Sequence, residues 1–175
     1  MTIPSLLSRV TPGMESVSAA FVPTSLLKRV DFPTLGRPTI ATVAAREILD
    51  SRGNPTVEAE VFVKNNSASS ICPSGASTGT HEAFEKRDKN NKRYLGKSVL
   101  SAVNLINTKI SKKLRGQNIH NQERIDALMI NLDATRQKNR LGANTILAVS
   151  IAVKKLSSKV KKIPLYKSFL VKNNF

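Results

Sequence analysis

The sequence predicts an α+β domain in which a three-stranded antiparallel meander is followed by a helical bundle. Two observations predict this order. Between residues 40 and 72, short segments rich in apolar and β-branched residues are separated by clusters of Asp, Asn, Gly and Pro, as in strands joined by tight turns. After Glu82, apolar residues recur every three to four positions, the period of a helix with one buried face. We therefore expect one domain over residues 40–175 and place residues 1–39 outside it.

The three expected strands are bounded by turns that the sequence makes recognisable. The first covers Ile40–Leu49 and ends at the turn cluster Asp50–Pro55. Within Val57–Val63, valine and alanine alternate with glutamate and phenylalanine, as in a half-buried strand. Lys64–Asn66 forms the next turn, and Ala68–Cys72 is the third strand. Short connections of this kind favour an antiparallel meander.

Three helices of ordinary length are expected after the sheet. The first covers Leu95–Leu114, and Gly116 can supply its C-terminal stop. The second runs to Leu132 from Asn121, which is a favourable N-cap residue. Asn144 or a near neighbour opens the third helix, whose many apolar residues predict that it is largely buried.

The end of the third helix is strongly basic. Cations suit the C-terminal end of a helix dipole, and five lysines gather there: Lys154, Lys155, Lys159, Lys161 and Lys162. A last short helix is expected over Pro164–Leu170.

Residues 1–40 show neither helical nor strand periodicity. Five prolines interrupt every candidate helix: Pro4, Pro12, Pro23, Pro33 and Pro38. The basic residues and serines of this segment are weakly similar to those of an organellar transit peptide, but the prolines oppose the amphipathic helix that such peptides form. We therefore expect residues 1–39 to be a disordered leader, or the product of a misassigned start, rather than a targeting signal.

The chain is strongly basic, with 28 basic and 12 acidic residues and a formal charge of +16. Such a surface attracts nucleic acid or anionic membranes without specificity. Because no aromatic-rich strip, zinc spacing or helix-turn-helix pattern accompanies the charge, we expect a solvated basic face and no specific nucleic-acid binding. No apolar run approaches the roughly 20 residues that span a bilayer. The single cysteine, Cys72, cannot form an internal disulfide and is expected to be half-buried.

The segment Ser74–Gly79 separates the strand-rich half from the helical half and is the candidate binding loop. Its two glycines let the backbone adopt positive φ and approach a ligand closely. Its hydroxyl groups, from Ser74, Ser77 and Thr78, could contact a phosphate or a hard cation. On composition alone, an ordinary connector of Gly and Ser is the alternative.

Charged residues after the loop form no complete catalytic set. Glu82, Glu85 and Asp88 could share one helical face, but basic residues lie among them, so an ion-paired surface is expected. His81 stands alone after the loop, and His120 is expected to be an exposed loop residue. No paired-His or Cys/His spacing supports a metal site.

Several motifs nevertheless occur in an order typical of one enzyme family. They are Asp50–Glu58, Pro73–Gly79 with Glu82-Ala83, Arg87-Asp88, Leu95–Lys97, Leu132-Asp133, Leu141–Asn144, Leu147–Ser150 and Pro164–Tyr166. With these motifs the chain resembles enolase (phosphopyruvate hydratase) from Ile40 to Leu170, which is the small N-terminal domain of that family. The resemblance implies the same α+β fold.

The resemblance also implies an activity and its requirements. Enolases of the cytoplasm dehydrate 2-phosphoglycerate to phosphoenolpyruvate in glycolysis with Mg²⁺ as cofactor, and the superfamily is a standard example of a basic side chain working with Mg²⁺. In the family, the base, its acid partner and the carboxylates of the first Mg²⁺ belong to a C-terminal (β/α)₈ barrel, and Phe175 precedes any barrel strand. We expect a fragment that is inactive alone. The alternatives are a non-enzymatic module whose basic surface binds an acidic partner or nucleic acid, and the remnant of a degraded gene.

Residue roles follow from the resemblance at a few positions only. In the family, the second serine of the loop, here Ser77, closes over the substrate and helps to bind the second Mg²⁺ together with substrate phosphate and barrel groups. The other residues of this substrate loop are Ser74, Gly75, Ala76, Thr78, Gly79 and His81, whose glycines and alanine would make it mobile.

Arg46 and Glu58 match positions at the homodimer contact of the family, where they face charges on the barrel of the partner. Without a barrel, these two charges are expected to have no partner in this chain.

Overall fold

The structure is a computed structural model that describes residues 38–75, 79 and 81–169. Most of the expected leader therefore lies outside the described residues. Its last two residues belong to the fold, because Thr39 forms an isolated antiparallel bridge with Asn118 and the carbonyl of Pro38 accepts a hydrogen bond from Ile119 across 3.1 Å. Long-range backbone pairing thus begins ahead of the boundary expected at Ile40.

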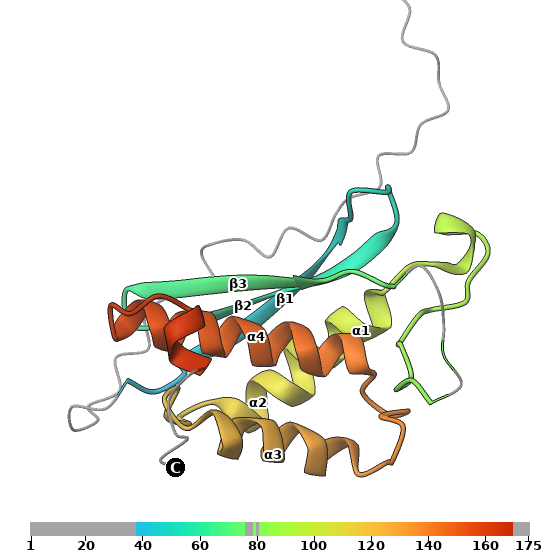
Figure 1. Cartoon of the computed structure of the whole chain (residues 1–175). Coiled ribbons are helices and arrows are strands. Elements are labelled where there is room, and N and C mark those ends of the chain that lie inside the picture. Colours follow the sequence, from blue (N-terminus) through green and yellow to red (C-terminus); the bar gives the residue numbers. More distant parts are fainter. Residues whose placement is uncertain (1–37, 76–78, 80, 170–175) are drawn as a thin grey trace, which may run out of the picture.

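The sheet is the expected three-stranded antiparallel meander, with strand order β1-β2-β3 (Figure 1). Its strands are β1 (Thr42–Leu49), β2 (Pro55–Val63) and β3 (Asn66–Cys72). In the register, Arg46 pairs with Glu58 and Glu58 pairs with Ile71, so these three residues share one face of the sheet. The turns predicted from the sequence connect the strands, which confirms the meander.

The helices follow the sheet and cover one of its faces (Figure 1). In chain order they are η2 (Tyr94–Gly96), α1 (Leu100–Leu105), the π-helical turn η3 (Ile106–Ile110), α2 (Ser111–Leu114), α3 (Gln122–Asp133), α4 (Ala143–Val160) and η4 (Tyr166–Phe169). Helix α4 packs against β2 and β3, and α1 and α2 pack against β1. Among the described residues, no helix is both long enough and apolar enough to cross a membrane.

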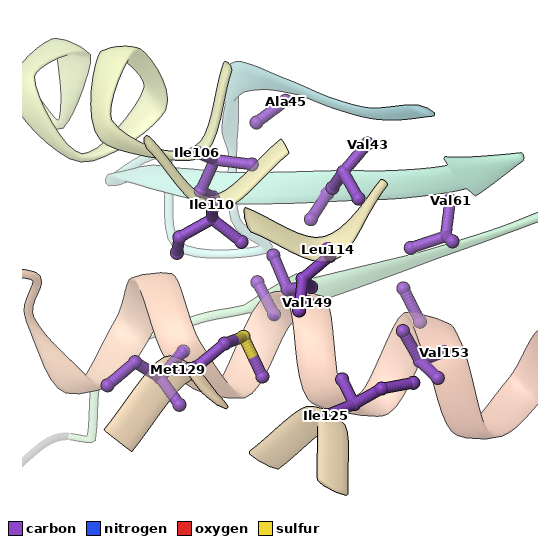
Figure 2. Packing of buried hydrophobic residues seen from close by; sticks show 14 of the residues in the cluster. Val43, Ala45, Val61, Ile106, Ile110, Leu114, Ile125, Met129, Val149 and Val153 are labelled. Carbon is purple, nitrogen blue, oxygen red and sulfur yellow. The ribbon is translucent and has the colours of Figure 1, made fainter. Parts of the chain in front are cut away.

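The hydrophobic core lies between the covered face of the sheet and the helices (Figure 2). The covered face contributes small and branched residues such as Val43 and Val61, which alternate with the polar residues of the open face. The helices contribute Ile106, Ile110, Leu114, Ile125, Met129, Val149 and Val153, all fully buried. The helical period of three to four therefore identified these packed positions correctly, although it also included Leu95, which is 84% exposed.

The first helix begins later than the sequence predicts. Leu95 is 84% exposed and lies in the short turn η2 with a φ of 52°. The carboxylate of Asp88 accepts hydrogen bonds from the backbone amides of Leu100 and Ser101, each across 2.9 Å, and thereby caps α1. Burial raises the pKa of Asp88, but the hydrogen bonds that its carboxylate accepts outweigh this effect, so the pKa is lowered.

Other helix boundaries agree closely with the sequence. The side chain of Asn121 accepts a hydrogen bond from the amide of Arg124 and caps α3, as predicted. Gly116 has a φ of 78° just after α2, as a helix stop requires. Helix α4 is largely buried, as expected, although Leu147 is 49% and Ile151 is 37% exposed. The predicted end of the last helix, Leu170, lies outside the described residues.

His120 is not the exposed loop residue that the sequence predicts. Its Nδ1 lies 2.8 Å from the hydroxyl of Ser157 on α4, and the side chain is partly buried. Burial lowers the pKa of His120, and the positive charge of Lys161 lowers it further. The histidine therefore ties the turn before α3 to α4.

Both edges of the sheet are covered by side chains from the helices. The side-chain amide of Asn107 accepts from the backbone amide of Ala45 across 2.7 Å and donates to its carbonyl across 3.1 Å. At the other edge, Lys155 and Lys159 donate to the carbonyls of Ser69 and Ser67. Unpaired strand edges promote association between chains, and these contacts occupy backbone groups at both edges.

Candidate functional site

The candidate loop leaves the sheet where β3 ends, beside the turn that joins β1 to β2. The structure describes Ser74, Gly75 and Gly79, together with His81 after the loop. Ala76, Ser77 and Thr78 lie outside the described residues, so the position of the serine that the resemblance singles out is not given. The described residues are those that flank the undescribed part of the loop on both sides.

Ser74 anchors the start of the loop through its hydroxyl group. The hydroxyl donates to Oε1 of Glu85 across 2.5 Å and accepts from Nη2 of Arg87 across 2.5 Å. Nη2 of Arg87 also lies 2.8 Å from the same carboxylate oxygen. The expected ion pair after the loop is thus confirmed for Glu85, although Glu82, Glu85 and Asp88 do not share the expected helical face, since residues 82–90 form no helix.

Arg87 connects four parts of the chain. Besides Ser74 and Glu85, its Nη1 donates to the carbonyl of Pro55 across 3.3 Å and to the carbonyl of Lys97. A guanidinium can serve several acceptors in a fixed planar geometry, whereas an ammonium cannot reproduce that fork. Arg87 therefore holds the start of β2, the loop, and the segment before α1 together.

The carbonyl of Ser74 is held by a second arginine, Arg52. Nη2 of Arg52 donates to this carbonyl across 2.5 Å and lies 3.4 Å from the carboxylate of Asp50. The amide of Asn54 does most to lower the pKa of Asp50, and the amide and charge of Arg52 act in the same direction. The β1–β2 turn is thereby fixed against the first residue of the loop.

The chain that follows the loop is fixed to the N-terminus of α4. The amide of Ala143 donates to the carbonyl of Phe84 across 2.7 Å, and the side chain of Asn144 bonds both backbone groups of Lys86. Gly142 has a φ of 94°, and a Cβ atom there would lie 2.5 Å from Cβ of Lys86. Glycine is therefore required both by conformation and by space.

An open hollow of about 250 Å³ lies beside the loop, and its walls come from the loop and the segment after it. Its lining residues are Ser74, Gly75, Gly79, Glu82, Ala83, Phe84 and Glu85. Hydroxyl and carboxylate oxygens are the ligands that Mg²⁺ prefers. Among the described residues, no three His, Cys, Asp or Glu side chains form a group that could hold a metal. A magnesium ion here would therefore need further oxygen ligands from a substrate and from groups beyond these residues.

Two other residues near the loop have no sign of a catalytic role. His81 is exposed to solvent. Burial raises the pKa of the Cys72 thiol, and the negative charge of Glu85 raises it further, so the thiol stays protonated at neutral pH. Cys72 is half-buried, as predicted.

Arg46 and Glu58 form a cross-strand ion pair on the open face of the sheet. Nε of Arg46 lies 2.6 Å from the carboxylate of Glu58, and the two residues are direct partners in the β1–β2 register. The expectation that these charges lack a partner within the chain is therefore wrong. The Arg46 side chain is 60% exposed, so it also remains available to a neighbouring molecule.

A second hollow, of about 320 Å³, lies along η3 and α2 and is lined by Asn107, Thr108, Ser111, Lys112 and Arg115. Three of its polar side chains are engaged inside the domain: Asn107 with Ala45, Thr108 with the carbonyl of Asn104, and Ser111 with the amide of Val43. Its other two lining residues, Lys112 and Arg115, are exposed. None of the five belongs to a motif that carries the resemblance, so the loop remains the candidate site.

Sequence reasoning missed Arg52 and Arg87 as the residues that fix the loop. Arg87 belongs to one of the motifs that carry the resemblance, and this membership was the one sign in the sequence that Arg87 could be important. Its four acceptors come from segments up to 32 residues away in the sequence, so no local pattern reveals them.

Comparison with known proteins agrees with the motifs. Residues 40–169 match the family described as "Enolase, N-terminal domain". An enolase of Pelagibacter ubique is 72% identical over 136 residues, which are 78% of this chain and 32% of that protein. Enolases of Methanosarcina mazei and Methanocaldococcus jannaschii are 53% and 57% identical over 80% and 73% of this chain.

The chain spans about a third of the length of the curated relatives that it matches. The match covers every described strand and helix, including the loop and the residues that hold it. On these grounds, the chain belongs to the enolase N-terminal domain family.

Proposed function

We propose that this chain supplies the loop-bearing domain of a phosphopyruvate hydratase. The reaction removes a proton from C2 and hydroxide from C3 of 2-phosphoglycerate, which yields phosphoenolpyruvate and water. The observation that carries the proposal is the clamp of Arg52, Glu85 and Arg87 on Ser74, in a chain whose relatives are named enolases. The corresponding setting is glycolysis in the cytoplasm.

The clamp divides the loop into fixed and movable parts. Ser74 is held by its carbonyl and its hydroxyl, and residues from Phe84 onward are held to α4. Closure over a substrate would therefore be limited to the few residues between these anchors, which include Ser77. A short loop with fixed ends loses less conformational entropy when it closes than a long free one.

Mg²⁺ would neutralise the negative charge that develops on the substrate during deprotonation. The hydroxyl of Ser77 would provide one oxygen ligand for the second ion, and substrate phosphate and barrel groups would provide others. The base and acid of the reaction would come from the barrel. We therefore propose that the 175 residues by themselves do not turn over 2-phosphoglycerate.

A chimeric enzyme tests the proposal. Residues 40–169 of this chain would replace the matching segment of the Pelagibacter ubique enolase, to which they are 72% identical over the aligned part. We expect kcat/KM for 2-phosphoglycerate within about tenfold of the parent, because this domain would restore loop closure. A folded chimera without activity would contradict the proposal, as would full activity of the barrel alone.

The role of Ser77 is tested in the same chimera. We expect Ser77→Ala to lower kcat by about 100-fold and to raise the Mg²⁺ concentration needed for half-maximal rate. Ser69→Ala, in β3, is the matched control and should leave both quantities unchanged. Equal kinetics for the two variants would remove Ser77 from the mechanism.

The isolated chain provides a separate test. Purified protein with 2-phosphoglycerate and Mg²⁺ should show no absorbance change from phosphoenolpyruvate above the buffer rate. Sustained turnover that scales with protein concentration would show that the barrel is not needed.

We also propose that Arg46 and Glu58 lie at a homodimer contact when a barrel is present. Exchanging the charges in Arg46→Glu/Glu58→Arg keeps the cross-strand pair but reverses the charge that faces a partner. We expect the chimera to become monomeric in sedimentation while its thermal unfolding changes little, because the exchanged residues still pair across the two strands. An unchanged dimer would exclude these residues from the contact.

A further inference from the structure

The basic residues of this domain are segregated from its acidic ones. Residues 134–169 contain nine lysines and arginines and no aspartate or glutamate. The ion pairs within the described part of the chain all use arginines, at positions 46, 52, 87 and 93. The lysines at the end of α4 are therefore not neutralised by carboxylates among the described residues.

The fold brings these lysines together with two exposed aromatic rings. Lys155 and Lys159 reach the carbonyls of Ser69 and Ser67, so the end of α4 lies alongside the start of β3 (Figure 1). After α4 the chain turns back, since the amide of Ile163 donates to the carbonyl of Ser158. The ring of Phe169 then lies 5.0 Å from Nζ of Lys154.

We call this region the lysine–aromatic surface. It consists of Lys154, Lys155, Lys159, Lys161, Lys162, Tyr166, Lys167 and Phe169. Tyr166 and Phe169 are 64% and 67% exposed, so most of each side chain is open to a ligand. The sequence alone gave no aromatic strip, because the two rings join the lysines only through the turn after α4.

Charge and rings together favour one kind of ligand. Unneutralised lysines attract a phosphate backbone, and exposed aromatic faces stack on unpaired bases. A membrane surface would need a continuous apolar face flanked by cations. Here the exposed apolar residues of α4, Leu147 and Ile151, come before the lysines in the helix. Tyr166 and Phe169 instead lie on either side of Lys167 in the sequence.

We propose that the lysine–aromatic surface binds single-stranded nucleic acid, with its lysines on the phosphates and Tyr166 and Phe169 stacked on bases. This binding is independent of the loop and of the proposed enolase activity. It is tested with the full chain and a fluorescein-labelled single-stranded RNA of about 20 nucleotides, by fluorescence anisotropy over a range of salt concentrations.

A matched pair of double variants separates this surface from diffuse charge. Lys162→Gln/Lys167→Gln removes two exposed lysines of the surface, and Lys109→Gln/Lys113→Gln removes two exposed lysines of η3 and α2. We expect the first pair to reduce the slope of log K against log salt by about 1.4, since each phosphate contact contributes about 0.7 for a single strand. The second pair should leave the slope unchanged. Equal reductions would overturn the proposal.

The rings provide the second readout. Tyr166→Ala should weaken binding about tenfold, because it removes a stacking face. Tyr94→Ala, at a tyrosine that is 43% exposed and lies in η2, outside the lysine–aromatic surface, is the control and should not weaken it. The assignment would be overturned if Tyr166→Ala left the affinity unchanged. It would also be overturned if duplex RNA bound at least as tightly as the single strand, or if the protein bound phosphatidylserine vesicles but not RNA.

Discussion

The guanidinium of Arg87 lies 2.5 Å from the hydroxyl oxygen of Ser74 and holds the point where the candidate loop leaves the sheet. Residues 13 positions apart in the sequence thus fix the start of the loop, with Glu85 bonded to both. Hydrogen bonds therefore hold the chain on both sides of the loop, at Ser74 and at Phe84.

The contribution of Arg87 can be measured by Arg87→Lys. Lysine keeps the charge but cannot serve Ser74, Glu85, Pro55 and Lys97 together. We expect the free energy of unfolding to fall by about 1–3 kcal/mol in urea denaturation, because acceptors at this junction lose their donor. In the chimera, the fold-decrease in kcat should exceed the fold-increase in KM, because the loop would be held less firmly. Wild-type values of stability and kcat would show that the clamp is dispensable.

Gly142 should tolerate alanine far less than Gly116. Both have positive φ, but a Cβ at Gly142 would meet Lys86 at 2.5 Å, whereas nothing lies within 4 Å of a Cβ at Gly116. Gly116→Ala should cost only the backbone strain, about 1–2 kcal/mol. Gly142→Ala should cost more than this and should also loosen the segment after the loop. Thermal unfolding and amide hydrogen exchange at Lys86 measure the two effects, and equal losses for both variants would argue against the close contact.

Asn107 protects the edge of the sheet by bonding both backbone groups of Ala45. The π-helical turn η3 bears Asn107, and such turns place side chains where a regular helix would not. Asn107→Ala should lower the free energy of unfolding by about 1–3 kcal/mol and should promote concentration-dependent association through the exposed strand. Asn104→Ala, at an exposed position of α1, is the control for light scattering and urea denaturation. A monomeric Asn107→Ala protein at high concentration would contradict the edge-protection role.

His120 should make stability depend on pH just below neutrality. Burial and then Lys161 lower its pKa from the ordinary value of 6.5, so the unfolded chain binds a proton that the folded chain resists. The free energy of unfolding should therefore fall as pH decreases through about 6.5 and toward the lower folded pKa. His120→Gln should flatten this decrease between about pH 7 and 5.5, whereas His81→Gln, at an exposed site, should retain it. Parallel urea titrations would detect the difference, and identical slopes for all three proteins would exclude His120 as the cause.

The sequence by itself determined the class and order of the fold. Alternation in β2 and three-to-four spacing in α1–α4 reflect which side chains face the core, and this is a local property of strands and helices. The caps Asn121 and Gly116 were predictable for the same reason, because their partners lie within a few residues. The ordered motifs established the family relationship, which the match over residues 40–169 confirms.

Only the tertiary structure decided how the loop is held and which surfaces are available. Leu95 continues the apolar period, yet the Asp88 cap starts α1 at Leu100 and leaves Leu95 in solvent. Arg46 meets Glu58 because the β1–β2 register sets them opposite each other.

Ser74, Glu85 and Arg87 likewise meet because β3 and the segment before α1 converge at one end of the sheet. Each of these contacts joins segments that are distant in sequence, so their geometry depends on packing and hydrogen bonding across the whole domain rather than on local periodicity.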